Sequence, residues 1–120
     1  MRDAGKIPCG EPILVVEDEK AIRNALSIVL SSGGYRVLEA TTGQEALAIA
    51  SSQCPRLILL DLGLPDRDGL QVLDALRAWT LLPVIVLSAR EQEASKVEAL
   101  ELGADDYVTK PFSINELLAR

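Results

Sequence analysis

The chain has 120 residues, of which 48% are hydrophobic and 25% are charged, and its formal net charge at pH 7 is −6. This composition is ordinary for one globular domain with a single core and argues against a disordered chain. Nucleic-acid binding by the chain itself is disfavoured, because phosphate contacts need clustered lysines and arginines. The sequence contains no histidine, which excludes histidine-based acid–base catalysis and histidine metal sites.

The cysteines and the apolar segments indicate the setting of the protein. Cys9 and Cys54 have neither a CxxC spacing nor the density of a disulfide-rich domain, so we expect free thiols and a cytoplasmic location. No apolar stretch reaches the length of about 18 residues that a transmembrane helix needs, and the N-terminus lacks a signal-like segment. We therefore expect no membrane insertion.

Strand and helix patterns alternate along the chain after a loose leader, residues 1–11, that has no clear period. Short apolar runs predict strands, and apolar residues at helical spacing predict helices. Gly33 and Gly34 follow the first helical pattern and are expected to stop it. The expected elements are, in chain order, a strand over 12–16, a helix over 20–32, a strand over 35–40, a helix over 43–52, a strand over 57–61, a helix over 69–79, a strand over 83–88, a helix over 91–102, a strand over 106–109 and a helix over 113–120 that the chain end cuts short.

Five strand–helix units predict an α/β domain over residues 12–120, with a doubly wound parallel sheet covered by helices on both faces. In such sheets ligands bind at the carboxyl ends of the strands, beside the point where the strand order reverses. The residues that follow the strands are therefore the candidates for a functional site.

Acidic residues follow two of the expected strands. Glu17 and Asp18 come after the first strand, and Asp61 ends the third. If these strands are neighbours, three carboxylates converge in one crevice and repel one another unless a cation lies among them. Oxygen ligands without histidine or thiolate suit Mg²⁺, which takes one or two carboxylates together with a substrate phosphate. Ser88 and Lys110, at the ends of the fourth and fifth strands, would complement the charge of a phosphoryl group.

Four motifs carry a resemblance to a known family. They are VVEDE (15–19), LLDLGLPDRDG (59–69), VIVLSA (84–89) and GADDYVTKPF (103–112), in this order and at the ends of the expected strands. Together they resemble the receiver domains of two-component response regulators, over about residues 12–120. The resemblance implies a flavodoxin-like sheet of five parallel strands in the order 2-1-3-4-5.

The resemblance also implies a role for each acidic residue. Asp61 matches the aspartate that accepts a phosphoryl group from a sensor histidine kinase. Glu17 and Asp18 match the acidic pair that binds Mg²⁺, with Asp61 and the main-chain carbonyl of Gly63 as further ligands. A receiver is a signalling phosphoacceptor rather than an enzyme that turns over a separate substrate.

Three residues nearer the C-terminus match the parts of a receiver that respond to phosphorylation. Ser88 matches the hydroxyl that bonds a phosphoryl oxygen, Lys110 matches the lysine of the site, and Tyr107 matches the switch aromatic. By resemblance, phosphorylation shifts an existing equilibrium towards an active conformation.

The motifs DLGLPDRDGL, LRAW and PVIVLSAR further resemble the Kdp-type branch of the winged-helix class, whose members control potassium-uptake genes. Members of that class carry a DNA-binding domain after the receiver, and this chain is expected to lack it, so that DNA is a partner only through the absent domain.

By the same resemblance, the fourth helix, fifth strand and fifth helix form a face through which phosphorylated domains dimerise. Its charge pairs match Lys96 with Glu116, and Asp106 with Arg120. Asp105 matches the acid of a third pair, whose basic partner is expected beyond residue 120.

The same residues allow other interpretations. Asp61 alone is a common turn residue, and Asp18 is a possible cap of the first helix. A phosphatase of the haloacid dehalogenase class also uses an aspartate nucleophile, but it needs a second acid two residues on, where this chain has Gly63. A nucleotide or flavin module needs a phosphate-binding loop, and EDEKA (17–21) has no glycine. An interaction-only receiver is expected to lack one of the site residues.

Overall fold

Strands and helices alternate through the part of the chain that the structure, a computed structural model, describes, which is residues 12–88 and 93–109. The elements are β1 (Ile13–Val16), α1 (Lys20–Ser32), β2 (Val37–Ala40), α2 (Gly43–Gln53), β3 (Leu57–Asp61), α3 (Gly69–Arg77), β4 (Val84–Ser88), α4 (Glu93–Glu101) and β5 (Asp106–Thr109). The predicted leader, residues 1–11, and the predicted last helix, 113–120, lie outside the described residues.

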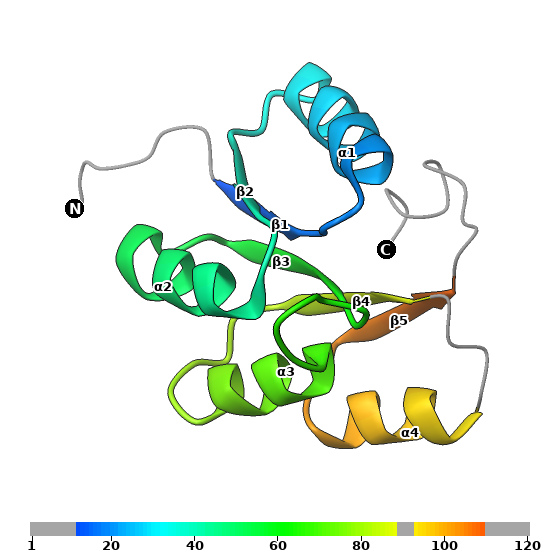
Figure 1. Cartoon of the computed structure of the whole chain (residues 1–120). Helices are drawn as coiled ribbons and strands as arrows, with labels where there is room; N and C mark the ends of the chain where they lie inside the picture. The colour runs from blue at the N-terminus through cyan, green and yellow to red at the C-terminus, as the bar shows by residue number, and fades with distance from the viewer. Residues whose placement is uncertain (1–11, 89–92, 110–120) are drawn as a thin grey trace.

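The five strands form one parallel sheet in the order β2-β1-β3-β4-β5 (Figure 1). The register aligns Val16 of β1 with Leu60 of β3, and Asp61 of β3 with Leu87 of β4. Strands β1 and β4 are buried along their whole length, because a parallel sheet with helices on both faces leaves its central strands no contact with water. The predicted fold class and strand order are confirmed.

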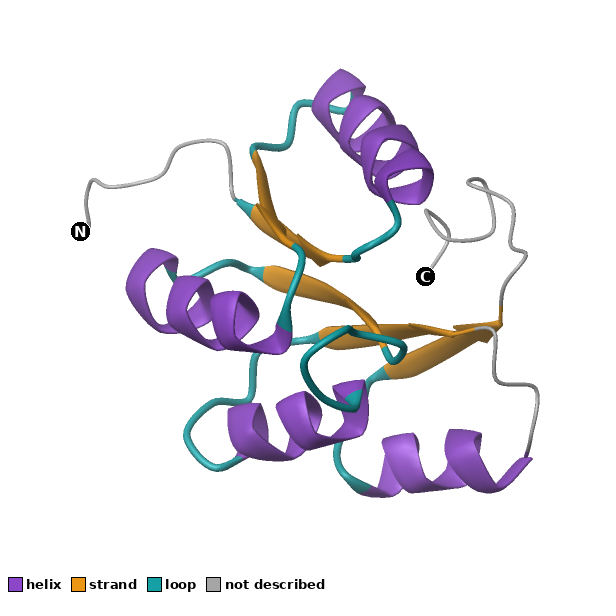
Figure 2. Ribbon diagram, in the orientation of Figure 1, coloured by secondary structure: helices purple, strands orange, loops and turns teal. Residues whose placement is uncertain are grey.

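Helices cover both faces of the sheet (Figure 2). Helix α1 lies on one face, where Leu26 and Leu30 pack with Val15 and Leu59 of the strands. Helices α2, α3 and α4 lie on the other face, over a larger apolar cluster that includes Leu73 of α3. Successive strand side chains point to opposite faces, so the same short apolar strands supply both cores.

The end of α1 agrees with the sequence and also sets the start of β2. Gly34 has φ +92°, a left-handed conformation that glycine adopts without strain. The backbone N–H of Gly34 donates to the carbonyl of Ser31, and the N–H of Tyr35 donates to that of Leu30. Because Tyr35 still closes the helix, β2 begins at Val37, two residues later than expected.

Helix α3 ends at Arg77 rather than at the predicted residue 79. The backbone N–H groups of Trp79 and Thr80 both donate to the carbonyl of Leu76, at 3.1 and 2.9 Å. The Thr80 hydroxyl then accepts the N–H of Leu82 at 3.2 Å, which completes a turn into β4. The turn leaves Trp79 51% exposed.

Candidate functional site

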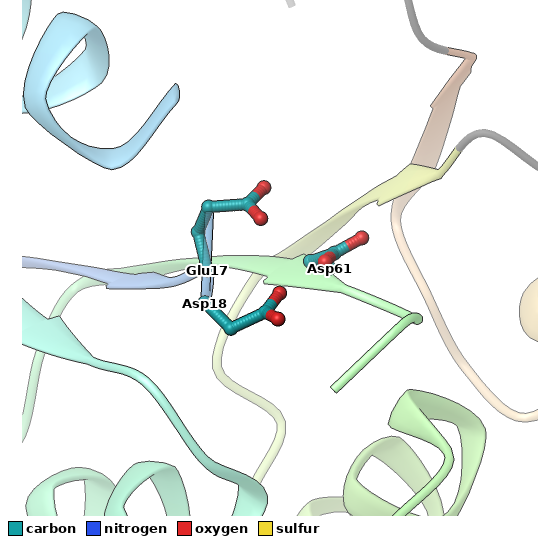
Figure 3. Close-up of side chains that lie close together, drawn as sticks. All are labelled: Glu17, Asp18 and Asp61. Carbon is teal, nitrogen blue, oxygen red and sulfur yellow. The ribbon is translucent and has the colours of Figure 1, made fainter. Parts of the chain in front are cut away.

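Three carboxylates meet at the carboxyl ends of β1 and β3. Glu17 and Asp18 directly follow β1, Asp61 is the last residue of β3, and a ligand oxygen from each lies within 4.8 Å of the other two. Figure 3 shows the three side chains turned to the same side of the sheet edge. Glu17 and Asp61 are buried, at 0% and 5% exposure, whereas Asp18 is exposed. The convergence expected from the sequence is therefore present.

The turn between β1 and α1 gives each of its acidic residues a different environment. The Glu17 carboxylate accepts the backbone N–H of Glu19 at 3.1 Å, which holds it across the turn. Glu19, not Asp18, is the N-cap residue of α1, and it makes no side-chain capping bond. The alternative that Asp18 caps this helix is therefore wrong, and its carboxylate faces the cluster instead.

An arginine that belongs to none of the sequence motifs supports this turn from α1. Arg23 Nη1 donates to the main-chain carbonyls of Glu17 and Asp18, at 3.0 and 3.4 Å. Arg23 Nε lies 3.6 Å from the Glu39 carboxylate of β2, and the Arg23 side chain is 15% exposed. The only sequence signal was a basic residue one turn into a helix that follows an acidic pair.

The loop between β3 and α3, residues 62–68, folds back tightly on Asp61. Gly63 and Asp68 form an antiparallel bridge, and the N–H of Gly69 donates to the carbonyl of Leu62 at 2.9 Å. A Cβ at Gly69 would lie 2.6 Å from the main-chain oxygen of Asp61, and a Cβ at Gly63 would lie 3.9 Å from its Oδ2. The loop thus returns against the backbone of Asp61 and keeps Gly63 beside its carboxylate.

The remaining predicted site residues fall on the two strands next along the sheet or outside the described part. Ser88 ends β4 and is 1% exposed, one residue beyond Leu87, the register partner of Asp61. Tyr107 of β5 is 6% exposed and belongs to the larger apolar cluster. Lys110 lies outside the described residues.

The donors of the cluster fit a hard divalent cation. All three offer carboxylate oxygens, which Mg²⁺ and Ca²⁺ prefer over nitrogen or sulfur ligands. The spacing lets one ion contact oxygens from the turn after β1 and from the end of β3 together, and an ion there would offset the repulsion among three carboxylates. The acidic cluster can therefore hold a cation of the Mg²⁺ type.

The residues predicted for a dimer face are only partly described. Asp105 already has partners within the chain: its carboxylate accepts the N–H of Val84 at 2.8 Å and lies 3.4 Å from Arg77 Nη2. Asp106 accepts the backbone N–H of Tyr107 at 2.8 Å. The Lys96 side chain, Glu116 and Arg120 lie outside the described part, and the dimer face stays a prediction.

Comparison with known proteins identifies the family. The chain matches the response regulator receiver domain model over residues 13–120, and it belongs to this family. It is 55% identical over 108 residues to KdpE, the KDP operon transcriptional regulatory protein of Escherichia coli strain K12, a match that covers 90% of this chain and 48% of that protein. The chain thus spans about half the length of the curated relatives it matches. The resemblance to receivers, and to their Kdp-type branch, is confirmed.

Solved structures agree with this assignment. The receiver domain of the Francisella response regulator 1452 has a TM-score of 0.87 at 37% identity, with 92% of each chain covered. The BeF3-activated receiver domain of Klebsiella pneumoniae RstA has a TM-score of 0.86 at 29% identity, covering 91% of this chain and 93% of that one. Across residues 12–88 and 93–109, none of the helices combines the length and apolar character needed to span a membrane.

Proposed function

We propose that this chain is the phosphoacceptor domain of a Kdp-type response regulator, and that Asp61 takes the phosphoryl group from a phosphohistidine of a sensor kinase. The observation that carries the proposal is the placement of Asp61 at the end of a buried strand, beside Glu17 and Asp18, with oxygens of all three within 4.8 Å. A nucleophile on a rigid strand end keeps its geometry better than one on a free loop.

The chemistry follows from this placement. An Asp61 carboxylate oxygen forms a bond to phosphorus while the bond from phosphorus to the histidine nitrogen breaks, and the nitrogen keeps the electron pair. Such transfers depend mainly on positioning and on charge stabilisation. Glu17, Asp18, Asp61 and the main-chain carbonyl of Gly63 would hold Mg²⁺, which when bound offsets the negative charge gathered at the site. Water later hydrolyses the acyl phosphate, so the domain signals and does not act as an enzyme on a separate substrate.

The same proposal covers the response to phosphorylation. A phosphoryl group adds a charge of about −1.5 to −2, which Ser88 and Lys110 stabilise through hydrogen bonding and charge. Tyr107 acts as the switch aromatic, and the cytoplasm, expected from the free cysteines, is the location. A DNA-binding domain carried by the whole protein then controls transcription, with potassium-uptake genes as the targets.

The proposal includes dimerisation of the phosphorylated domain through α4, β5 and the predicted last helix, by the charge pairs Lys96–Glu116 and Asp106–Arg120. Each such pair contributes about 0–1 kcal/mol at an exposed rim, and a two-fold interface repeats it. Asp105, whose side chain is 55% exposed, would share its carboxylate between Arg77 and the third pair. Sedimentation velocity with and without beryllofluoride tests this, and a chain that stays monomeric with beryllofluoride bound contradicts it.

Mass spectrometry after incubation with acetyl phosphate and Mg²⁺ tests the phosphoacceptor assignment. The parent chain is expected to gain one phosphoryl group, and Asp61→Asn to gain none while its circular dichroism is unchanged, because only the nucleophile is lost. Asp74→Asn, an exposed position of α3, is the matched control and is expected to label like the parent. A labile phosphoryl adduct on Asp61→Asn would show that the assignment is wrong.

A further inference from the structure

The first turn of α2 obtains its hydrogen-bond acceptors from two separate segments of the chain. The first N–H groups of a helix have no partner within the helix and need acceptors from elsewhere. Thr42, the N-cap residue, supplies one, because its hydroxyl accepts the N–H of Glu45 at 3.1 Å. The N–H groups of Gly43 and Gln44 donate to the carboxylate of Asp66, at 2.7 and 3.1 Å.

Asp66 belongs to the β3–α3 loop, which therefore lies against the start of α2 (Figure 1). It sits within the segment that the bridge between Gly63 and Asp68 encloses. Its neighbour Arg67 touches the same helix: a Cβ on Gly43 would lie only 2.8 Å from Arg67 Cγ and Cδ. The loop is thus fixed at its base by its own bridge and on its outer side by α2.

Charge strengthens this contact. Hydrogen bonds from backbone N–H groups to an ionised carboxylate are stronger than those between neutral groups, and the N-terminus of a helix favours negative charge. The N–H of Gly43 holds the pKa of Asp66 below its ordinary value of 3.8, and the N–H of Gln44 and the charge of Arg67 act in the same direction, while desolvation acts against them. Asp66 is therefore ionised and bound to α2 at neutral pH.

We propose that Asp66 is a positioning residue of the phosphoacceptor site, which ties the β3–α3 loop to α2 and thereby fixes the main-chain carbonyl of Gly63 beside Asp61. This inference rests on the proposed function. Mg²⁺ demands near-ideal octahedral geometry, so a carbonyl ligand on a loop that shifts weakens the ion's binding. Asp66 itself touches neither the ion nor the phosphoryl group.

The test compares two variants that damage the same helix start. Asp66→Ala removes the acceptor for two N–H groups and frees the loop, whereas Thr42→Ala removes the acceptor for one N–H group and leaves the loop tied. The readouts are thermal unfolding in EDTA and Mg²⁺ affinity by titration calorimetry. Both variants are expected to unfold at lower temperature, but only Asp66→Ala is expected to lose Mg²⁺ affinity, by about 10-fold, the lower end of the cost of losing a supporting group at a metal site.

Asp66→Asn provides a milder change, because an amide keeps one acceptor oxygen, and its Mg²⁺ affinity is expected to fall between those of the parent and Asp66→Ala. Asp66→Asn decides the question if Asp66→Ala does not fold. Parent-like Mg²⁺ affinity in the folded Asp66 variants, or an equal loss in Thr42→Ala, overturns the inference alone. A parent chain that binds no Mg²⁺ overturns the proposed metal site, and this inference with it.

Discussion

The β1–α1 turn carries two carboxylates of the acidic cluster and the β3–α3 loop returns against the third, yet side chains of opposite charge support the two segments. In the turn, the cationic side chain of Arg23 donates to carbonyls five and six residues earlier in the chain. In the loop, the anionic side chain of Asp66 accepts N–H groups that lie 22 and 23 residues earlier. The first support comes from the adjoining helix, the second from a helix that belongs to another strand–helix unit.

This difference separates local support from long-range support. Arg23 lies in the first half of the adjoining helix α1, and the N–H of Glu17 also donates to the Ala40 carbonyl of β2 at 3.0 Å. The loop bonds to α2 only when α2 and β3 are packed together, and closing a longer segment of chain costs more entropy. The side-chain support of the loop therefore depends on long-range packing, whereas that of the turn comes from the adjoining helix.

The largest effect is expected where the loop meets the strand. In Gly69→Ala the new Cβ would lie 2.6 Å from both the main-chain oxygen of Asp61 and the Cα of Leu62, and backbone cannot move aside as a side chain does. Overpacking of this kind is expected to lower the free energy of unfolding by about 3 kcal/mol in urea denaturation.

The control for this prediction lies in the same loop. Gly63 is exposed, and a Cβ there would meet only Asp61 Oδ2, at an ordinary contact distance of 3.9 Å, so Gly63→Ala is expected to change the free energy of unfolding by no more than about 0.5 kcal/mol. If Gly63→Ala and Gly69→Ala lowered the free energy of unfolding equally, the close contact of the loop with the Asp61 backbone would not determine the stability of the domain.

An intermediate effect is expected from removal of the support of the turn. Arg23→Met keeps much of the apolar stem but leaves the carbonyls of Glu17 and Asp18 without the Arg23 donor. We expect this change to lower the free energy of unfolding by about 2 kcal/mol in urea denaturation. Glu39→Gln removes the ion pair, whose acid is 43% exposed, and keeps an amide oxygen as acceptor for the Ser27 hydroxyl, so it is expected to lower the free energy of unfolding by less than about 1 kcal/mol. If Glu39→Gln lowered the free energy of unfolding more than Arg23→Met does, the bonds from Arg23 to the two carbonyls would not be the main support of the turn.

The smallest effect is expected in the pH dependence of stability that comes from the hydrogen bonds between Asp66 of the loop and the first turn of α2. The pKa of Asp66 is lowered in the folded chain, chiefly by the N–H of Gly43. Its contribution to stability is therefore complete above the ordinary value of 3.8 and is lost as the pH falls through the lower folded value. The difference in urea midpoint between the parent and Asp66→Asn is expected to be constant from neutral pH to about pH 5 and to narrow below it.

The difference between the parent chain and Asp66→Asn reports the titration of one carboxylate, that of Asp66. The pKa of Glu45 is also lowered, chiefly by the backbone N–H of Thr41, but Glu45 is present in both proteins and its contribution cancels. A difference that stays constant down to pH 3 would show that the charge of Asp66 does not contribute to the tie.

Much of the fold was predictable because it depends on local pattern. The apolar run before Asp61 predicted β3 to the residue, and Gly33 with Gly34 predicted the end of α1. The end of α3 was misplaced because Trp79 continues the apolar pattern, while the backbone of Thr80 closes a turn instead. Periodicity reports the face of a helix more reliably than its last residue.

The site was predictable only in part, because the sequence pattern indicates strand ends but not contacts with main-chain atoms. Glu17, Asp18 and Asp61 stand at strand ends, so topology alone brings them together. Arg23 and Asp66 act through contacts with main-chain atoms, and such contacts leave no pattern in the sequence. Asp105 was matched to a charge pair between subunits, which stays a prediction, and its contact with Arg77 of α3 within the chain was not foreseen.

The position of Glu39 has a consequence for the behaviour of the chain at high concentration. Strand β2 is at one edge of the sheet and has only four residues, Val37–Ala40. An exposed strand edge is a template for pairing with another molecule, and short length and charge are the usual protection against aggregation. Arg23 and the Ser27 hydroxyl hold Glu39 at this edge, so the same arginine that supports the acidic turn also keeps a negative charge where an invading strand would have to pair.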